Sequence, residues 1–306
     1  MYTLEDLQTE LLTKIQAKTE EFTRLFHGRG GCYEGWEFLT VDSIDTVLSI
    51  AYFSEIDEAL EKQLYALFER LSQTGAYEAI VLQRRYLPKS PSEVIFGSLR
   101  ERLYARENGI LYKLDLLNNQ NNGFFADMKI GREFVRENAQ GKRVLNLFSY
   151  TCAFSVVALK GGASSVVNVD MSKRVLETGR DNHRLNDVQV RGTRYMPYNI
   201  LKSFSRIKKA GPYDLIIIDP PSFQKGSFAA SKDYQKIIRR MDELASDECT
   251  VLSCLNSPSL DSQFILDLYK AEAPSFMFIK RLDNMESFPS KESERALKNL
   301  VFKNYN

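Results

Sequence analysis

Apolar residues recur at two different periods along this chain, and the change between them divides it into two parts. Before residue 118 a few segments of helical spacing are mixed with short apolar runs typical of strands. The elements predicted there are helices over residues 4–26 and 56–71 and strands over 47–53, 79–82 and 111–116. The polar run 118–123 is typical of a boundary. We therefore predict a small α+β domain over residues 1–117 and a second domain over 118–306.

After the boundary, short apolar runs alternate regularly with helical segments. The predicted strands are 144–148, 166–169, 191–196, 215–219, 250–254, 276–280 and 300–303, with helices over 173–186 and 233–244 among the segments between them. Such alternation predicts a mainly parallel sheet with helices on both faces. The last strand follows the sixth closely, which favours an antiparallel edge pair. The predicted fold class is a Rossmann-like α/β sheet of seven strands, mainly parallel with one antiparallel edge strand.

Composition narrows the classes of function. The chain has 306 residues, 43% of them hydrophobic, which suffices for a proper core. Four separated cysteines and two histidines argue against a zinc site, a disulfide scaffold and histidine-based catalysis. No apolar stretch approaches the roughly 20 residues that span a bilayer, and the first residues lack the pattern of a signal peptide. We therefore expect a cytoplasmic protein that contacts neither membrane nor metal.

Local basic segments carry the sequence evidence for nucleic-acid contact, because the net charge is only +1. Residues 84–89 and 100–106 both mix cations with aromatic rings, as phosphate contact beside base stacking requires. The alternative is an ordinary solvated surface. Arg84 and Arg85 are the substrate-contacting candidates of this region.

The most informative motif is Asp-Pro-Pro-Ser-Phe at residues 219–223, which directly follows the apolar run of a predicted strand. Ligands of open α/β sheets bind where the strands end. Here a carboxylate, Asp219, is followed by Pro220 and Pro221, which fix the backbone, and by the ring of Phe223, which is available for stacking. This combination suits a flat polar ring. The alternative is that the prolines merely end the strand, and the neighbouring motifs argue against it.

The turn after the first strand of the second part indicates the cofactor class. A dinucleotide fold would have Gly-x-Gly-x-x-Gly there, but residues 149–154 read Ser-Tyr-Thr-Cys-Ala-Phe. A ligand without phosphates tolerates such a turn. Asp170 ends the next strand at the interval of about 20 residues at which a carboxylate binds a ribose diol. S-adenosylmethionine, a nucleoside with an amino-acid tail, fits both observations. The alternative is that Asp170 only caps the helix beginning near Ser172.

Five motifs in this order resemble those of class I S-adenosylmethionine-dependent methyltransferases of the RlmI and RlmK kind, which modify large-subunit ribosomal RNA. The motifs are Asn122–Lys129, Asn146–Thr151, Val169–Ser172, Asn182–Asn186 and Asp219–Phe223. The resemblance covers roughly residues 120 to 306 strongly. It implies S-adenosylmethionine as cofactor and RNA as partner.

The resemblance also implies roles for individual residues. The cofactor-binding residues that it implies are Phe125 and Asp127 as a cover, Phe148, Ser149 and Thr151 as a floor, Asp170 at the ribose, and Met171, Asn199 and Asp219 beside them. Two positions depart from the family pattern. Cys152 stands where glycine is usual, and Asn199 stands where an aspartate usually meets the adenine amino group. An asparagine oxygen still accepts that hydrogen bond, so we expect modestly weaker cofactor binding.

Cys254 suggests which reaction is catalysed. It ends the fifth predicted strand, and in the RlmI type a cysteine at this position is the nucleophile of cytosine C5 methylation. C5 of a pyrimidine attacks a methyl group only after a thiolate has added at C6. Asp219 would then steady N3 of the base. Against this interpretation, free cysteines are often simply packed, and Leu255-Asn256 differs from the Ser-Cys-Ser usual in these enzymes.

Three alternatives remain open in the sequence. RlmK-type enzymes, which methylate guanine N7, need no cysteine because a ring nitrogen already has its lone pair. A non-catalytic RNA-binding protein would keep basic segments but need not keep Asp127, Asp170 and Asp219 together. A nicotinamide or nucleotide enzyme would want glycines in the first turn. The oligomeric state, a homodimer among the choices, is not determined by the sequence.

Overall fold

The computed structural model describes residues 2–188, 192–224 and 226–304, and it divides into two compact units. The first unit runs to Ala126 and includes the later segment Met285–Lys291. The second comprises Asp127–Asn284 and the chain from Glu292 onward. The division therefore falls beyond the boundary predicted at residue 117, and a short late segment returns to the first unit.

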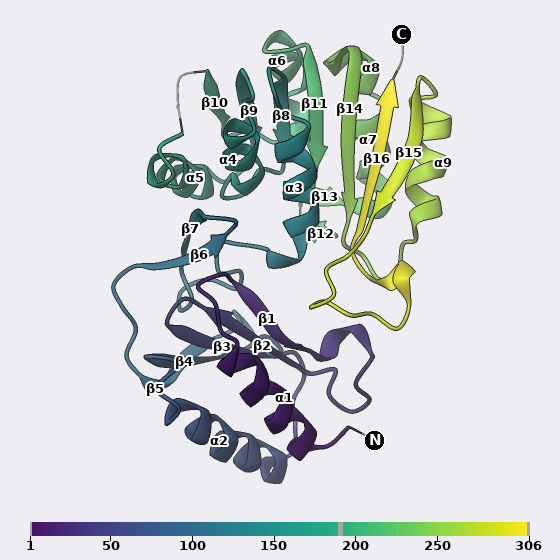
Figure 1. Cartoon of the computed structure of the whole chain (residues 1–306). Helices are drawn as coiled ribbons and strands as arrows, with labels where there is room; N and C mark the ends of the chain where they lie inside the picture. Colours follow the sequence, from purple (N-terminus) through teal and green to yellow (C-terminus); the bar gives the residue numbers. More distant parts are fainter. Residues whose placement is uncertain (1, 189–191, 225, 305–306) are drawn as a thin grey trace. The chain divides into compact units, whose positions relative to one another are not determined.

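The first unit contains a five-stranded sheet in the order β1-β2-β3-β4-β5, two helices and a separate hairpin (Figure 1). Its elements are α1 (Leu4–Gln16), β1 (Thr23–His27), η1 (Gly28–Gly30), β2 (Leu39–Ile44), β3 (Val47–Tyr52), α2 (Glu58–Ser72), β4 (Ala79–Arg84), β5 (Ser92–Gly97), β6 (Leu103–Glu107) and β7 (Ile110–Leu114). Strands β3 and β4 are parallel, whereas the other neighbouring pairs of this sheet are antiparallel. The α+β character of this region is as the sequence predicts.

The prediction of one helix over residues 4–26 is wrong. Helix α1 begins after the capping box of Thr3 and Asp6 and ends at Gln16, and β1 starts at Thr23. Apart from Ala17, the segment 17–21 is polar and offers no large apolar side chain to continue the buried face of the helix. Phe22 and Phe26 match helical spacing by coincidence, because Phe26 belongs to a strand that pairs with β2.

The second unit confirms the predicted fold class. Within the described residues its sheet has seven strands in the order β10-β9-β8-β11-β14-β16-β15. They are β8 (Arg143–Leu147), β9 (Ser165–Val169), β10 (Thr193–Met196), β11 (Tyr213–Ile218), β14 (Ala245–Leu255), β15 (Phe276–Leu282) and β16 (Lys298–Asn304). Strand β16 is antiparallel to both β14 and β15. Arg191, the first residue of the predicted third strand, lies outside the described residues.

Helices cover both faces of this sheet (Figure 1). They are α3 (Lys129–Glu137), α4 (Ala153–Lys160), α5 (Lys173–Leu185), α6 (Phe204–Lys209), α7 (Ala230–Ile238), α8 (Met241–Leu244) and α9 (Ser262–Glu272), with short turns η2 (Ala126–Met128), η3 (Ile200–Lys202) and η4 (Ser293–Arg295). Residues from α6 to α9 form one apolar core with alternate residues of the central strands. The helix predicted over 233–244 is divided into α7 and α8 at Arg239 and Arg240.

Candidate active site

The turn between β8 and α4 has an unusual backbone for its sequence. Phe148, Tyr150 and Cys152 all adopt positive φ angles, of 57°, 46° and 62°. Glycine takes this conformation without strain, whereas other residues adopt it at a cost and chiefly at functional sites. The turn therefore holds three residues other than glycine in a conformation that favours glycine. Cys152, at the position where the family resemblance leads us to expect glycine, is one of them.

Helix α5 is shaped to accept the Cys152 side chain. Cys152 is fully buried, and a Cβ atom on Gly179 would overlap its Sγ. Nearby, the Asn182 amide donates a hydrogen bond of 2.9 Å to the carbonyl oxygen of Thr151. Glycine at 179 and asparagine at 182 therefore hold the strained turn from the same helix.

Asp170 lies at the end of β9, beside this turn. Its carboxylate accepts hydrogen bonds from the backbone N–H groups of Tyr150, at 3.0 Å, and Ser172, at 2.9 Å. Ser172 is itself the N-cap of α5, because its hydroxyl accepts from Val175 N–H. Burial raises the pKa of Asp170, while the two N–H groups lower it. Since each carboxylate oxygen accepts more than one hydrogen bond, Asp170 keeps acceptor capacity for a ligand diol.

Met171 and Asn199 are brought together from the ends of β9 and β10. The Asn199 amide nitrogen lies 3.5 Å from the sulfur of Met171. Its oxygen accepts from Lys202 N–H at 3.2 Å, so Asn199 caps η3. Met171 is 46% exposed, which leaves an apolar side chain available to cover a flat ring.

The residues around this turn fit a nucleoside. Ser149 and Thr151 are buried, and apart from the thiol of Cys152 the Ser149 hydroxyl has no polar partner in the described part of the chain. A buried hydroxyl of this kind is satisfied when a polar ligand arrives. The ring of Phe148 packs against the ring of Phe228 in an edge-to-face arrangement, with ring centroids 4.9 Å apart. Hydroxyl, carboxylate and apolar side chains therefore line one edge of the sheet.

The Asp-Pro-Pro-Ser-Phe motif follows β11 and enters a small hairpin of β12 (Phe223–Gln224) and β13 (Phe228–Ala229). Pro220 is buried, whereas Pro221 is exposed and Phe223 is 71% exposed. The Ser222 hydroxyl donates a hydrogen bond to the carbonyl oxygen of Asn256. The motif is thus tied to the loop that follows β14, and it leaves one aromatic ring in solvent.

Asp219 and Cys254 come next to each other at the ends of adjacent parallel strands, because Ile218 pairs with Ser253. Burial and the charge of Asp127 raise the pKa of Asp219 to about 7, and Arg132 opposes this rise. Burial and the charges of Asp219 and Asp127 raise the pKa of the Cys254 thiol well above its usual value. The cluster therefore favours the neutral thiol of Cys254 and leaves Asp219 partly protonated near pH 7.

Cys254 is enclosed in the free protein. It is 1% exposed and lies opposite Asn299 in the antiparallel pairing of β14 and β16. The Asn299 amide is buried too, and neither its oxygen nor its nitrogen has a hydrogen-bond partner among the described residues. Its nitrogen packs near Gly131 of α3.

Tyr234 of α7 connects the two strand ends. Its buried hydroxyl donates to the carbonyl oxygen of Cys254, at 3.1 Å, and lies 3.4 Å from that of Ile218. One hydroxyl proton is shared between two acceptors in this arrangement. Tyr234 therefore connects the ends of the two paired strands that lead to Asp219 and carry Cys254.

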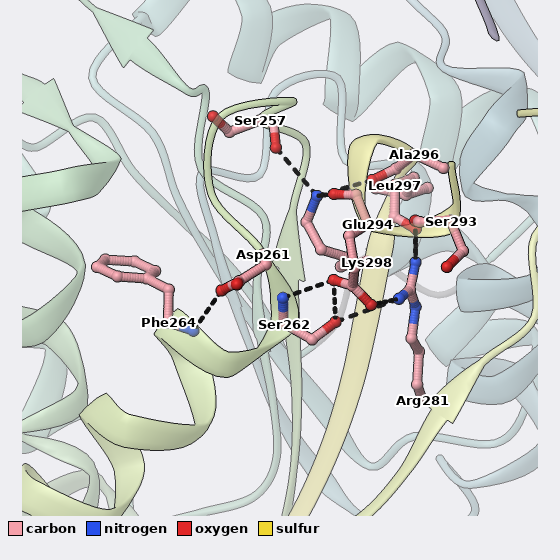
Figure 2. Close-up of polar contacts among 10 residues, drawn as sticks. All are labelled: Ser257, Asp261, Ser262, Phe264, Arg281, Ser293, Glu294, Ala296, Leu297 and Lys298. Atoms are coloured by element: carbon pink, nitrogen blue, oxygen red, sulfur yellow. Dashed lines mark hydrogen bonds and ion pairs between the residues drawn. The ribbon is translucent and has the colours of Figure 1, made fainter. Parts of the chain in front are cut away.

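A buried lysine anchors the loop after Cys254 (Figure 2). The ammonium group of Lys298 is fully buried and donates to the carbonyl oxygens of Ser257, Glu294 and Ala296, at 3.0, 2.6 and 2.9 Å. Burial and the nearby Arg281 guanidinium lower the pKa of Lys298 to about 8. All three donors of the ammonium group are used, so Lys298 holds the loop in place.

Three predicted residues lie in the first unit. Phe125 is 40% exposed and precedes η2. Arg84 is held by ion pairs with Glu61 and Glu93, so its charge is balanced within the sheet. Arg85 has no ion pair among the described residues, and its guanidinium group donates 2.6 Å to the carbonyl oxygen of Gln120. Of these two neighbouring arginines, only Arg84 therefore has its charge balanced by carboxylates among the described residues.

Sequence reasoning missed several residues of this site: Arg132, Ser222, Tyr234, Lys298 and Asn299. Ser222 lies inside the motif at residues 219–223, so its presence there was an available signal, whereas Arg132 lies just past the motif Asn122–Lys129. The others are defined by distant contacts across the sheet. Among the described residues, no group of His, Cys, Asp or Glu side chains is arranged to bind a metal ion. No helix in the described ranges is long and apolar enough to cross a membrane.

Comparison with known proteins identifies related chains. A family model described as S-adenosylmethionine-dependent methyltransferase matches residues 23–303. YwbD of Bacillus subtilis, whose name describes a ribosomal RNA large subunit methyltransferase, is 29% identical over 288 residues, which are 90% of this chain and 72% of that protein. Ribosomal RNA large subunit methyltransferase I of Aeromonas salmonicida is 32% identical over 213 residues, which are 67% of this chain and 54% of that protein.

A solved structure agrees with these relatives. A protein from Streptococcus mutans described as a SAM-dependent methyltransferase superposes with a TM-score of 0.85 at 26% sequence identity. The match covers 97% of this chain and 80% of that one. The similarity therefore extends over both units of the chain.

Proposed function

Because the chain belongs to the S-adenosylmethionine-dependent methyltransferase family, we propose that it methylates large-subunit ribosomal RNA at C5 of a cytosine. The names of its relatives in Bacillus and Aeromonas support ribosomal RNA as the substrate. The observation that carries the choice of C5 is the placement of Cys254 beside Asp219 at adjoining strand ends. A thiol and a carboxylate at one point are what carbon methylation of a pyrimidine requires.

S-adenosylmethionine, the cofactor of this family, supplies an electrophilic methyl group. The residues proposed to hold it are Phe148, Ser149, Thr151, Asp170, Met171 and Asn199, with Asp127 and Phe125 from the preceding segment. Asp170 would accept hydrogen bonds from the ribose hydroxyls. Met171 would cover the adenine ring. The amide of Asn199 would turn toward the adenine edge, at the cost of weakening its cap of η3.

The target base is proposed to leave its stack and lie against Phe223. An aromatic ring that is 71% exposed on a short hairpin suits stacking, which contributes about 1–3 kcal/mol per base. The backbone of Pro220 and Pro221 has no N–H groups to compete for the polar edge of the base. This leaves Asp219 to make the directional contact.

Asp219 is proposed to act as an acid toward N3 of cytosine. With a pKa of about 7, it is partly protonated at neutral pH and so donates a hydrogen bond. Protonation at N3 draws electrons from C6, where the sulfur of Cys254 adds. A C6–S bond forms, and the electrons of the C5=C6 bond make C5 nucleophilic.

The later steps reverse this addition. C5 accepts the methyl group, loses its proton to water, and the C6–S bond breaks to restore the double bond and the thiolate. For the first step the buried Cys254 thiol gives its proton to Asp219, which is ionised once it has protonated N3. After the C6–S bond breaks, the thiolate takes this proton back from Asp219, and the carboxylate then accepts the proton from N3.

A second candidate is methylation of guanine N7. The observation that favours it is the burial of Cys254 and the raised pKa of its thiol, which oppose formation of a thiolate. A ring nitrogen attacks directly with its lone pair and needs no cysteine. Asp219 and the Pro220-Pro221 backbone would then orient a purine.

One experiment separates the two reactions. Ribosomal RNA containing 5-fluorocytosine should form a denaturant-resistant adduct with the wild-type protein, because fluorine does not leave C5 as a proton does. Cys254→Ser should form no adduct and lose turnover. Retention of most activity by Cys254→Ser, with the methyl group found on guanine by mass spectrometry, would establish the second candidate instead.

A further inference from the structure

Three strands of the N-terminal sheet end at the same edge. Strand β1 is antiparallel to β2, and β2 is antiparallel to β3, so β1 runs in the direction of β3 and its parallel neighbour β4. The pairing places His27, Thr40, Ala51 and Gln83 in one row across the sheet. Arg29 comes two residues after His27, Phe53 comes two residues after Ala51, and Arg85 comes two residues after Gln83. The topology therefore gathers two arginines and one aromatic ring.

The side chains make contact at this edge. The guanidinium carbon of Arg29 lies 3.8 Å from the ring centroid of Phe53, and that of Arg85 lies 5.3 Å from the same centroid. A third arginine, Arg24, lies 4.6 Å from the ring of Phe288, within the same unit. Planar guanidinium groups stack well on aromatic faces, which helps to fix their orientation. Arg85 also donates hydrogen bonds to Gln83 Oε1, Gln120 O and Asn121 Oδ1, at 3.3, 2.6 and 3.2 Å, so only its remaining N–H groups are available to a ligand.

Positive charge is in excess here. Arg24 is paired with Asp42, and it donates 2.7 Å to Nδ1 of His27. Burial and the charges of Arg24 and Arg29 lower the pKa of His27 to about 3, so this ring is neutral. Neither Arg29 nor Arg85 has a carboxylate partner within the described part of the chain. Three guanidinium groups thus share one carboxylate.

The loop that carries Arg29 depends on its glycines. A Cβ atom on Gly28 would overlap the carbonyl oxygen of Trp36, and one on Gly30 would overlap that of Pro289. Gly31 adopts a φ of 73°. In the sequence Gly-Arg-Gly-Gly, the backbone therefore packs tightly on both sides of the exposed Arg29. A side chain fixed in this way loses little entropy on binding.

We infer that this arginine–aromatic cluster, defined as Arg29, Phe53 and Arg85, binds the phosphodiester backbone of the RNA substrate. Arg24, whose guanidinium group is bound to Asp42 and His27, adds positive charge beside it. The inference rests on the proposed function for the class of ligand. A guanidinium fork matches two phosphate oxygens, and most protein contacts to a nucleic-acid backbone are of this type. The other arginines singled out in the sequence serve differently, because Arg84 and Arg100 are each paired with acidic residues.

The test measures RNA affinity as a function of salt, using the full chain and unmodified large-subunit ribosomal RNA made by transcription. The variants are Arg29→Ala, Arg85→Ala and the double variant. The control is Arg70→Ala on α2, which removes the same charge from an exposed position of the same unit. Cofactor affinity and thermal denaturation of each variant establish that it is folded.

Each lost phosphate contact should reduce the slope of log K against log salt by about 0.7 to 0.9. The affinity should fall about ten-fold per arginine, while Arg70→Ala binds as the wild type does. Arg29→Lys keeps the charge but loses the planar stack on Phe53, so it should retain the slope and lose part of the affinity. Turnover at saturating RNA should change little, because the cluster serves binding.

The outcomes separate this inference from the proposed function. If the wild type methylates ribosomal RNA and the double variant has the wild-type slope and affinity, the inference is wrong and the function stands. A second outcome is that the wild type binds the RNA with a salt slope that falls in the arginine variants, and yet transfers no methyl group to it. In that case the inference about the cluster is supported and the proposed function is wrong. Absence of binding by the wild type would overturn both.

Discussion

Burial and the charge of Asp219 raise the pKa of the Cys254 thiol, and the two residues end neighbouring parallel strands. A carboxylate beside a thiol disfavours the thiolate while it offers an acceptor for the thiol proton. The same carboxylate has a pKa of about 7. This pair therefore couples the chemistry of the site to the stability of the fold near neutral pH.

Replacement of Asp219 by Asn should stabilise the protein at pH 8 and leave it unchanged near pH 4. Ionised Asp219 is disfavoured in the folded state, because burial and Asp127 raise its pKa from about 4 to about 7. The stability associated with its protonated form is complete below about pH 4 and is lost as the pH rises through 7. The advantage of the Asn variant should reach at most about 4 kcal/mol. Urea denaturation across this pH range measures it.

The matched control is Asp247→Asn, at an exposed position within β14. Its unfolding free energy should follow that of the wild type at every pH. A constant difference between Asp219→Asn and the wild type from pH 4 to 8 would contradict the raised pKa.

Removal of the Tyr234 hydroxyl should reduce turnover more than stability. Tyr234→Phe loses the hydrogen bond to the carbonyl oxygen of Cys254, at a cost of about 1 kcal/mol in unfolding free energy. The spacing of the Cys254 and Asp219 strand ends also relaxes. Tyr269→Phe is the control, because its buried hydroxyl contacts Ser253 Oγ at 2.8 Å and not the Cys254 carbonyl. Equal losses of kcat in the two variants would show that Tyr234 has no specific role.

Lys298→Met should destabilise the second unit by about 2–4 kcal/mol. It leaves the carbonyl oxygens of Ser257, Glu294 and Ala296 without their donor in a buried position. Lys62→Met on exposed α2 is the control and should have little effect, since its ion pair with Glu58 is at the surface. Chemical denaturation of the two variants measures the difference. Similar stability of both would mean that water replaces the ammonium group.

Gly179→Ala should be destabilising in the wild type and much less so when Cys152 is Ala. The added methyl group would overlap the sulfur of Cys152, and overpacking of this kind costs about 1–3 kcal/mol. A double-mutant cycle on unfolding free energies isolates the coupling. Additive effects would show that α5 moves freely away from the turn. The affinity for S-adenosylmethionine should fall in Gly179→Ala, because the turn before α4 shifts.

The local pattern was sufficient to predict the central strands of the second sheet, because these strands are buried on both faces and read as short apolar runs between helices. The same logic placed Asp170 and Asp219 at strand ends. It failed over residues 4–26, where the spacing of Phe22 and Phe26 fits a helix and the pairing with β2 decides for a strand. Local periodicity does not contain that information, since the partner strand lies further along the chain.

The sequence by itself determined which segments of the second domain form strands and where the Asp-Pro-Pro motif lies, because each depends on neighbours within one strand or turn. The resemblance of its motifs to a known family implied the candidate cofactor residues. Tertiary structure alone decided which charges are balanced. It pairs Arg84 with two glutamates but leaves Arg85 beside Arg29 and Phe53, and it buries Lys298 against three carbonyl oxygens. These relations join residues far apart in the chain, so their physical cause, proximity in the folded sheet, exists only after folding.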